Sequence, residues 1–418
     1  MNIKTIEIQN FKGFEYKEFS FNPNMTVLIG DNGTGKTSIL DALSFILGTF
    51  FIGVDGIPNR SLRQSEKRWK IVSPQSFEVQ LPFKISVEHT LNGQYYSWSR
   101  GTDKAHGGST TYINAIKLIH QAQYLTKCVR AGDIVVDLPL IAYFGTKRLS
   151  EKITRPRYVK QSSRLEGYDN ALDPFSFRYT FLDWFRTFED SVLKFNSHGE
   201  RALYNAFTKT ILSMIPEWQN VHFNWQVNDM LGQLENGEWM PFEMLSDGYK
   251  NIVRLSADIA YRAIKLNPHL GENAVKETEG VVLIDEIDMH LHPNWQKTVI
   301  SDLKRTFPKI QFIVTTHSPF IVQSLRADEI INLDENELSK DPEILSLEEN
   351  ALYMGVQDSK SDKFFRKGKI AEEYLDLLNT KNNDEALLAK LDELLSEFGD
   401  DPVFIAKLKL ERLAKLGR

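Results

Sequence analysis

The chain has 418 residues, a formal net charge of −6, 42% apolar residues and 25% charged residues. These values are typical of globular proteins and exclude a largely disordered, collagen-like or disulfide-scaffold chain. The single cysteine, Cys128, excludes an internal disulfide framework and a zinc site with four cysteine ligands. The sequence shows neither a signal-peptide pattern nor an apolar run of about 18 residues, so we expect a cytoplasmic protein without a membrane partner.

The first 50 residues predict two strands, a loop and a helix. Residues 1–10 alternate apolar and polar side chains, and Met25–Ile29 is apolar enough for a buried strand. A glycine-rich loop follows at residues 30–37. Thr37–Leu47 carries apolar side chains at helical spacing, which predicts a helix directly after the loop.

Residues from about 50 to 240 give a weaker pattern, which we interpret as an insertion of strands and helices. Phe77–Trp98 predicts two or three antiparallel strands with a hairpin turn at Asn92-Gly93. Leu138–Phe144 predicts another buried strand, and Phe175–Phe195 predicts an aromatic-rich helix.

The pattern becomes regular after residue 240. Gly248–Leu266 and Pro293–Phe307 predict helices, whereas Gly280–Ile284 and Ile310–Thr315 predict buried strands. Such alternation is typical of α/β folds in which helical crossovers connect a mostly parallel sheet.

The C-terminal part is a polar linker at Gln357–Lys369 followed by a tail with helical patterning. We therefore expect a head over residues 1–356, with the insertion at about 50–240, and a linker with a helical tail over residues 357–418. The tail is a candidate docking element for a partner. Its apolar stripe consists of Leu387, Leu388, Leu391, Leu394 and Leu395.

Residues 30–37 read Gly-Asp-Asn-Gly-Thr-Gly-Lys-Thr and match the pattern G-x-x-x-x-G-K-[ST]. The glycines allow backbone N–H groups to surround phosphate oxygens, and the following helix directs its positive end to the same anion. Lys36 is expected to contact the β- and γ-phosphates of ATP, and Thr37 to bind Mg²⁺. The nucleotide-binding residues predicted here are Asn32, Gly33, Gly35, Lys36, Thr37 and Ser38.

Two carboxylates, Asp285 and Glu286, directly follow the apolar strand at residues 280–284. Ligands of parallel sheets bind at the carboxyl ends of the strands. Asp285 can hold Mg²⁺ there through water, and Glu286 can polarise the attacking water as a general base.

Two further segments carry candidate phosphate contacts. Ser246 and Gly248 begin a predicted helix and can form a second anion-binding nest, which suggests that two protomers share each nucleotide. Their spacing alone favours an ordinary capped helix, and that alternative stays open. His317 follows the strand at residues 310–315 and is a candidate for a hydrogen bond to the γ-phosphate.

These motifs, in this order, resemble ATP-binding-cassette ATPases, and specifically the heads of the SMC, RecF and OLD branch. The start Asn-Phe-Lys-Gly-Phe at residues 10–14 is also similar to that branch. The resemblance implies an ABC-type ATPase head with an antiparallel β lobe, assembled as a homodimer or higher oligomer. It implies that Lys12 approaches the nucleotide, that Ser246 and Gly248 act on the partner's nucleotide, and that Asp288 lies in the loop that crosses the dimer interface.

A closer resemblance is carried by residues 285–296, 316–319 and 141–148. These segments are similar to the standalone ATPases of bacterial anti-phage systems, and most to the PtuA-like ATPases of Septu and of Septu-like retron systems. The resemblance is strong over residues 1–50 and 240–330. It implies slow ATP hydrolysis, no nuclease centre in this chain, and a separate HNH nuclease subunit as partner. A retron reverse transcriptase and its DNA product are further candidate partners.

The glutamine that senses Mg²⁺ in cassette ATPases stays unassigned. Gln121, Gln123 and the segment Tyr143–Arg148 are the candidates. His290 and His292 suggest a metal site, but the resemblance favours a structural or nucleotide-edge role for both.

The alternative function is a DNA-binding ATPase of the repair or chromosome-maintenance type. Two basic segments would allow contacts to a phosphate backbone, although a charge run is more often a solvated face. A transporter subunit is disfavoured, because its signature usually reads Ser-Gly-Gly-Gln whereas this chain has Ser-Asp-Gly-Tyr. The basic residues are Lys147, Arg148, Lys152, Arg155, Arg157, Lys160 and Arg164 in the first segment, and Arg60, Arg63, Lys67, Arg68 and Lys70 in the second.

Overall fold

The computed structural model describes residues 1–73, 76–91, 93–107, 109–146, 163–173, 180–195, 197–334, 341–355, 362–380, 385, 389–390, 392–393 and 402–416. The chain divides into two compact units, Met1–Gly355 and Val356–Arg418, and each is described by itself. Among the described residues, no helix is both long and apolar enough to cross a membrane.

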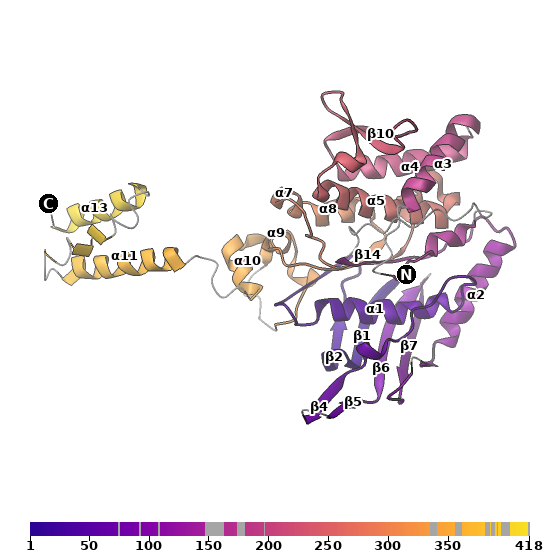
Figure 1. Cartoon of the computed structure of the whole chain (residues 1–418), viewed down its shortest axis with the longest axis horizontal. Helices are drawn as coiled ribbons and strands as arrows, with labels where there is room; N and C mark the ends of the chain where they lie inside the picture. The colour runs from indigo at the N-terminus through magenta and orange to yellow at the C-terminus, as the bar shows by residue number, and fades with distance from the viewer. Residues whose placement is uncertain are drawn as a thin grey trace. The chain divides into compact units, whose positions relative to one another are not determined.

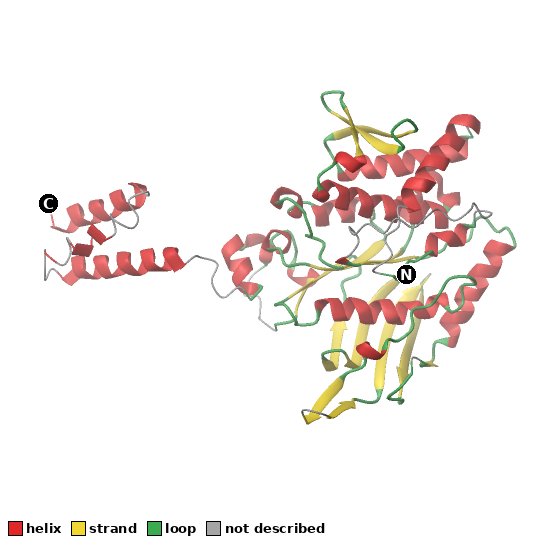
Figure 2. Cartoon of the chain, viewed as in Figure 1, coloured by secondary structure: helices red, strands yellow, loops and turns green. Residues whose placement is uncertain are grey.

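A parallel sheet of five strands forms the centre of the first unit (Figures 1 and 2). The strand order is β15-β3-β14-β13-β9, and every neighbouring pair is parallel. Four of the five strands are buried throughout, which explains why their sequences are nearly continuous apolar runs. The strands are β3 (Met25–Ile29), β9 (Leu140–Phe144), β13 (Gly280–Ile284), β14 (Ile310–Thr315) and β15 (Ile330–Asn332).

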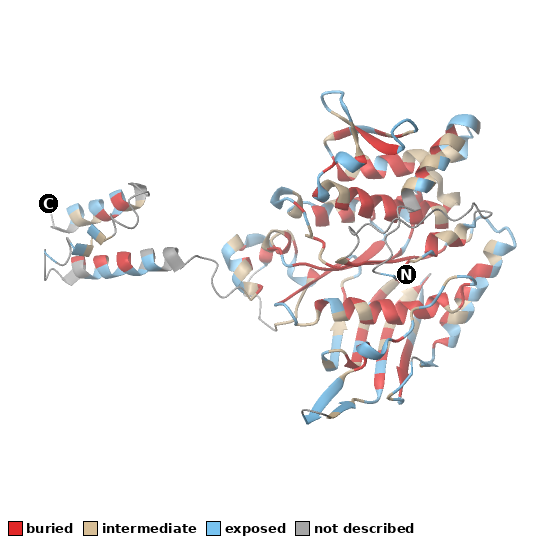
Figure 3. Cartoon of the chain, in the orientation of Figure 1, coloured by how far each residue is buried: buried red, intermediate tan, exposed pale blue. Residues whose placement is uncertain are grey.

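Helix α1 (Lys36–Phe51) lies between this sheet and an antiparallel sheet, and contacts strands of both (Figures 1 and 3). Because it is covered on two sides, 13 of its 16 residues are buried and it is apolar around most of its circumference. The antiparallel sheet, with order β2-β1-β6-β7-β8, is the β lobe that the sequence predicted. Its strands are β1 (Asn2–Phe11), β2 (Phe14–Ser20), β6 (Phe83–Leu91), β7 (Gln94–Thr102) and β8 (Thr111–Ile113).

Helices cover the opposite face of the parallel sheet (Figure 1). Helix α5 (Asp247–Leu266) packs on β9, and α4 (His198–Met214) packs on α5 and on α8 (Val299–Thr306). The sequence analysis predicted α5 but neither α4 nor the small sheet β10-β11-β12. The remaining elements of this unit are α2 (Ile116–Arg130), α3 (Thr180–Phe195), β4 (Trp69–Ser73), β5 (Ser76–Val79), β10 (Trp218–Asn224), β11 (Asp229–Leu234), β12 (Trp239–Pro241), α6 (Ala274–Glu277), α7 (Pro293–Gln296), α9 (Pro319–Val322) and α10 (Leu347–Tyr353).

The single helix predicted over Pro293–Phe307 is wrong, because the segment forms two helices, α7 and α8. Gln296, at the end of α7, donates from its side-chain amide to the backbone oxygen of Leu291 at 2.8 Å. It also accepts a hydrogen bond from the Ser318 hydroxyl at 2.6 Å. These bonds tie α7 to the loops at the strand ends, and the helix restarts at Val299 to pack as α8.

In the second unit, α11 (Asp362–Thr380) and α13 (Pro402–Leu416) pack on each other. The tail is therefore helical in these parts, as predicted. The predicted end of the linker at Lys369 is wrong, because α11 already begins at Asp362. The five leucines of the predicted apolar stripe lie outside the described residues. The shared core consists of Ile370, Ala371, Tyr374, Leu378, Ile405 and Leu408.

His89, on β6, is a histidine buried without a hydrogen-bond partner for either ring nitrogen among the described residues. Its ring stacks on Tyr96 at 5.1 Å and meets Trp98 edge-on at 4.6 Å between centroids. Burial lowers its pKa from 6.5 to about 3. The unfolded chain therefore binds a proton here below pH 6.5 that the folded chain does not accept until about pH 3. In this window the free energy of unfolding should fall by up to about 1.4 kcal/mol for each unit that the pH drops.

We expect His89→Phe to remove this part of the acid sensitivity while keeping a ring in the same place. The measurement is the urea midpoint of the wild type and the variant between pH 7 and pH 4. His106→Phe, at an exposed histidine, is the matched control and should leave the pH dependence unchanged. Equal pH slopes for the wild type and His89→Phe would contradict the assignment.

Candidate functional site

The glycine-rich loop before α1 closes around the side chain of its own lysine. The Lys36 ammonium donates to the backbone oxygens of Gly30 at 2.6 Å and Asp31 at 3.0 Å. Burial lowers the pKa of Lys36, and surrounding carboxylates oppose that shift. Gly33 and Gly35 have φ angles of 90° and 104°, a region that favours glycine. The loop thus surrounds the Lys36 ammonium, which can exchange these backbone oxygens for phosphate oxygens.

The predicted nucleotide-binding residues occupy the loop and the first turn of α1. Asn32 is exposed in the loop, and Lys36, Thr37 and Ser38 begin the helix, whose N-terminal N–H groups form the positive end of its dipole. This is the arrangement of a helix N-terminus that binds an anion.

Thr37 meets a carboxylate from the neighbouring strand end. Its hydroxyl lies 3.1 Å from both carboxylate oxygens of Asp285, which follows β13. Asp285 is 3% exposed, and its Oδ1 accepts a hydrogen bond from the Thr315 hydroxyl at 2.7 Å. A hydroxyl and a carboxylate held together are oxygen ligands of the kind that Mg²⁺ prefers beside phosphates. These residues therefore fit a magnesium nucleotide.

Glu286 is positioned through the same threonine. Its backbone N–H donates to the Thr315 hydroxyl at 2.7 Å, and its φ angle of 47° turns the chain sharply away from β13. The half-buried Glu286 side chain follows directly on Asp285. Thr315 thus connects the Asp285 carboxylate and the Glu286 backbone to the end of β14.

Asp288 anchors the segment that carries His317. Its Oδ1 accepts hydrogen bonds from the Thr316 hydroxyl at 2.6 Å and from the His317 backbone N–H at 3.3 Å. The His317 side chain is exposed. Because β13 and β14 are parallel neighbours, His317 and Glu286 lie at the same edge of the sheet.

The N-terminus of α5 packs against the loop after Glu286. A Cβ atom at Gly248 would lie 2.6 Å from the backbone oxygen of His290. A contact within the same protomer therefore already requires glycine at this position. Asn251 strengthens the contact by donating to the backbone oxygen of Met289 at 2.8 Å. Ser246 is the exposed N-cap residue, and its hydroxyl makes no capping hydrogen bond to α5. The pair predicted as a phosphate contact therefore contains one packed glycine and one exposed serine.

Lys12 lies in a turn with a φ angle of 47°, and its backbone N–H donates to the backbone oxygen of Glu66 at 2.8 Å. Its ammonium pairs with Asp41 on α1. The guanidinium of Arg60 bridges the Asp41 and Glu66 carboxylates at 3.1 Å and 2.6 Å. This network fixes the turn beside the first half of α1. Within it, the Asp41 carboxylate pairs with the positive charge of Lys12.

Two segments distant in the sequence pack on the glycine-rich loop. The Phe14 ring is so close to Gly35 that a Cβ atom there would lie 2.5 Å from it. The Asp334 carboxylate, two residues after β15, accepts a hydrogen bond from the Asp31 backbone N–H at 2.8 Å. It is also the strongest of the nearby charges that keep the Lys36 pKa from falling further.

The second basic segment is only partly an exposed patch, because Arg63 and Lys70 are exposed whereas the side chains of Arg60 and Lys67 are buried. Arg60 bridges two carboxylates, and the Lys67 ammonium donates to three backbone oxygens within residues 104–107. Of the first segment, the structure describes only Arg164, whose guanidinium donates to the backbone oxygens of Leu266 and Val136. These three cations have structural partners.

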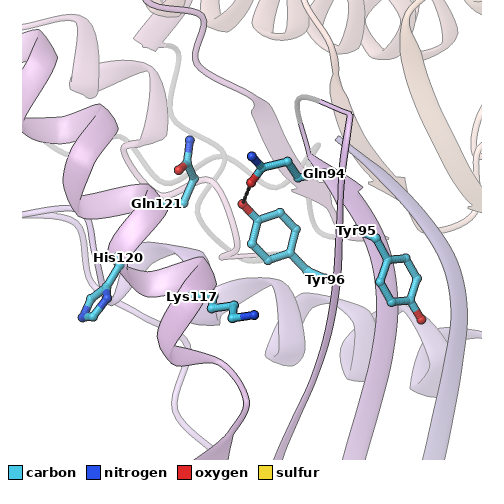
Figure 4. A pocket seen from close by; sticks show the side chains of 6 residues that line it. All are labelled: Gln94, Tyr95, Tyr96, Lys117, His120 and Gln121. Atoms are coloured by element: carbon cyan, nitrogen blue, oxygen red, sulfur yellow. Dashed lines mark hydrogen bonds between the residues drawn. The ribbon is translucent and has the colours of Figure 1, made fainter.

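Of the candidate Mg²⁺ sensors that the structure describes, only the segment that begins at Tyr143, at the end of β9, reaches the site. The backbone oxygen of Phe144 accepts a hydrogen bond from the Asp285 N–H at 2.8 Å. Gln121 lines a separate pocket beside α2 (Figure 4), and Gln123 is exposed on the same helix. Lys147 and Arg148 lie outside the described residues. His292, the other residue with an open role, accepts a hydrogen bond at its Nδ1 from the Asn294 N–H at 3.3 Å and caps α7.

Sequence reasoning missed Thr315, Thr316 and Asp334 as site residues. Thr315 and Thr316 immediately precede His317, so their position at the end of a strand was the signal. Asp334 follows the apolar residues 330–331 and 333, a short strand signal that was not used. The Arg60–Glu66 ion pair gave no signal in the sequence, because Arg60 lies in an irregular segment and Glu66 in a single 3-10 turn.

The sequence profile of the RecF/RecN/SMC N terminal domain matches residues 2–340. The chain belongs to this family. The RecF/RecN/SMC assignment, together with the parallel sheet and antiparallel lobe, confirms the predicted α/β fold of an ABC-type ATPase head.

The chain is also similar to ATPases named for retron systems and to Septu PtuA proteins, which confirms the predicted resemblance. It is 27% identical to the Retron Ec83 probable ATPase of Escherichia coli, over 98% of this chain and 86% of that protein. It is 26% identical to the Retron Vc95 probable ATPase of Vibrio cholerae serotype O1 biovar El Tor, over 80% of this chain and 75% of that protein. It is 27% identical to the Septu protein PtuA of Bacillus mycoides strain KBAB4, over 80% of this chain but only 41% of that longer protein.

Among solved structures, an SMC head bound to the C-winged helix domain of ScpA aligns with a TM-score of 0.47 and 17% identity. The alignment covers 79% of this chain and 94% of that one.

Proposed function

We propose that this RecF/RecN/SMC-type head binds ATP with Mg²⁺, hydrolyses it slowly, and regulates a partner HNH nuclease in a bacterial anti-phage complex. The observation that carries the proposal is the contact between Thr37 and Asp285, which joins the glycine-rich loop to the strand-end carboxylate across 248 residues. The relatives named for retron and Septu systems support the defence context.

ATP binding uses donor groups of the glycine-rich loop and of the first turn of α1, which already face the same site. Backbone N–H groups of the loop and of the first turn of α1 surround the phosphates, while the Lys36 ammonium exchanges the oxygens of Gly30 and Asp31 for phosphate oxygens. Thr37 and Asp285 would hold Mg²⁺, Asp285 directly or through water, and the ion would supply neutralisation of the phosphate charge.

The hydrolytic step uses the edge formed by β13 and β14. Glu286 accepts a proton from the attacking water, and His317 donates a hydrogen bond to the γ-phosphate. Thr315 and Asp288 are positioning residues, because they hold Glu286, Asp285 and the His317 backbone rather than the substrate.

The composite-site part of the proposal can be tested by mixing two inactive protomers. In Lys36→Ala the loop is disabled, whereas in Ser246→Arg a bulky side chain blocks the partner's nucleotide. A mixed dimer holds one intact site, formed by the Ser246→Arg loop and the Ser246 of the other protomer. We expect each variant alone to be nearly inactive. A 1:1 mixture that exchanges subunits at random should recover up to about a quarter of the wild-type ATPase rate, because about half of the dimers are mixed and each of these holds one intact site of two.

A mixture that stays inactive, with mixed dimers verified by native mass, would show that Ser246 acts within its own protomer. Gly248 is unsuitable for this test, because any side chain there collides with His290 inside the chain. Ser324→Arg supplies the matched control, a serine at the opposite end of the sheet that should retain activity alone.

The nuclease partnership is tested by expressing the tagged chain with its flanking genes and analysing the purified complex by mass spectrometry. A stoichiometric HNH-type subunit is the expected result. A homodimer that carries DNA but no protein partner would instead favour the repair-type ATPase, and with it the alternative function.

A further inference from the structure

Two carboxylates beside the glycine-rich loop have no part in the proposed binding and hydrolysis of ATP. Four carboxylates stabilise the positive charge of Lys36, in decreasing order those of Asp334, Asp31, Asp285 and Glu286. Asp285 would hold Mg²⁺, and Glu286 would accept a proton from water. Asp31 and Asp334 do neither, and negative charge beside a phosphate site opposes the binding of an anion. Their presence therefore needs another explanation.

The Asp334 carboxylate contacts the first two residues of the loop. Its Oδ2 atom accepts a hydrogen bond from the Asp31 backbone N–H at 2.8 Å, and a Cβ atom at Gly30 would lie 3.2 Å from the same oxygen. The backbone oxygen of Asp31 in turn accepts a hydrogen bond from the Lys36 ammonium at 3.0 Å. Asp31 therefore connects Asp334 to the ammonium group that must turn toward the phosphates when ATP binds.

The same two residues also contact the end of the first unit. The Asn332 side chain accepts a hydrogen bond from the Asp334 N–H at 3.0 Å and donates one to the backbone oxygen of Tyr353 at 3.0 Å. Gly355, two residues beyond α10, has a φ angle of 91°, and a Cβ atom there would lie 2.8 Å from Oδ1 of Asp31. Because the first unit ends at Gly355, the loop contacts the last residue before the chain enters the second unit.

We propose that Asp334 and Asp31 are positioning residues that lower the affinity for ATP and couple its binding to the end of the first unit. This coupling rests on the proposed binding of ATP at the loop. Without nucleotide, the Lys36 ammonium offsets the charge of both carboxylates. Once phosphates engage the ammonium, Asp334 and Asp31 repel the added negative charge. The repulsion weakens their contacts with the loop and with Gly355, and by linkage these contacts disfavour bound ATP to the same extent.

The test is Asp334→Asn, because the asparagine oxygen can accept the same hydrogen bond from Asp31 but carries no charge. We expect this variant to bind ATP with Mg²⁺ about tenfold more tightly than the wild type in a calorimetric titration at low salt. At about 0.5 M salt the gain should fall to about twofold, because the Debye length is then only about 4 Å. Single-turnover hydrolysis of bound ATP should proceed at the wild-type rate. Loss of a merely structural contact would weaken ATP binding instead.

The second measurement is hydrogen exchange of the backbone amides of residues 350–355, with and without ATP and Mg²⁺. In the wild type we expect ATP to speed this exchange at least about threefold, because the contacts of Asn332 and Asp31 with the segment weaken. In Asp334→Asn the same degree of ATP saturation should cause a smaller change. The control Asp183→Asn removes an equal charge from an exposed position on α3 and should match the wild type in both measurements.

Equal or weaker ATP binding by Asp334→Asn than by the wild type would overturn the electrostatic role of Asp334. Exchange at residues 350–355 that does not respond to ATP would overturn the coupling to the end of the first unit. In both cases the wild type still binds ATP, and the proposed function is unaffected. A wild type that binds no ATP would instead contradict the proposed function itself, and the role of Asp334 with it.

Discussion

Lys36→Ala should lower ATP affinity at least about 100-fold, equivalent to about 3 kcal/mol, because it removes charge-assisted hydrogen bonds to two phosphates. In the folded protein the ammonium is nearly buried and already directed at the loop by the backbone oxygens of Gly30 and Asp31. No other side chain in the loop carries a positive charge. We expect the same variant to abolish protection of cells against phage.

The affinity is measured by calorimetric titration with ATP and Mg²⁺, and protection by plating efficiency. Lys84→Ala, at an exposed lysine on the antiparallel sheet, is the control and should bind ATP like the wild type. Thermal unfolding of both variants guards against misfolding. Full phage protection by a folded Lys36→Ala protein would show that nucleotide binding does not gate the system.

Glu286→Gln should bind ATP as tightly as the wild type but hydrolyse it at least about 100-fold more slowly, the size of effect typical of a general base. The amide cannot accept the proton of the attacking water, whereas it has the same shape as the carboxylate. The backbone hydrogen bond from residue 286 to Thr315 is unaffected by the change, so the turn after β13 should persist.

Single-turnover hydrolysis separates this chemical step from ATP binding and product release. The control Glu18→Gln removes an exposed carboxylate from β2 and should turn over at the wild-type rate. A Glu286→Gln variant that hydrolyses ATP at the wild-type rate would exclude Glu286 as the base. A variant that no longer binds ATP would assign it a structural role.

The parts of the fold that the sequence predicted are those with strong local signals. The strands β3, β13 and β14 are buried on both faces, so their apolar runs are visible without knowledge of their neighbours. The loop at residues 30–37 has a fixed residue pattern, because glycines are needed at its positive φ angles. The residues of this loop thus indicate both where the phosphate site lies and which ligand it binds.

The parts that the sequence did not predict depend on contacts between distant segments. The burial of Arg60 and Lys67 follows from Asp41, Glu66 and the backbone at residues 104–107, so a charge count could not distinguish them from surface cations. Likewise, the requirement for glycine at position 248 comes from a carbonyl group 42 residues later. The spacing of apolar residues also did not predict α4 and β10. Both belong to an outer layer in which buried and exposed residues are mixed.

The most direct measurement is native mass spectrometry of the Glu286→Gln protein with and without ATP and Mg²⁺. If the glycine-rich loop and the strand-end carboxylates form a shared nucleotide site, ATP should appear in assemblies of two or more protomers, with one nucleotide for each protomer. The same assemblies should not form with Lys36→Ala. A mass that stays the same on addition of ATP, with no bound nucleotide, would contradict the account.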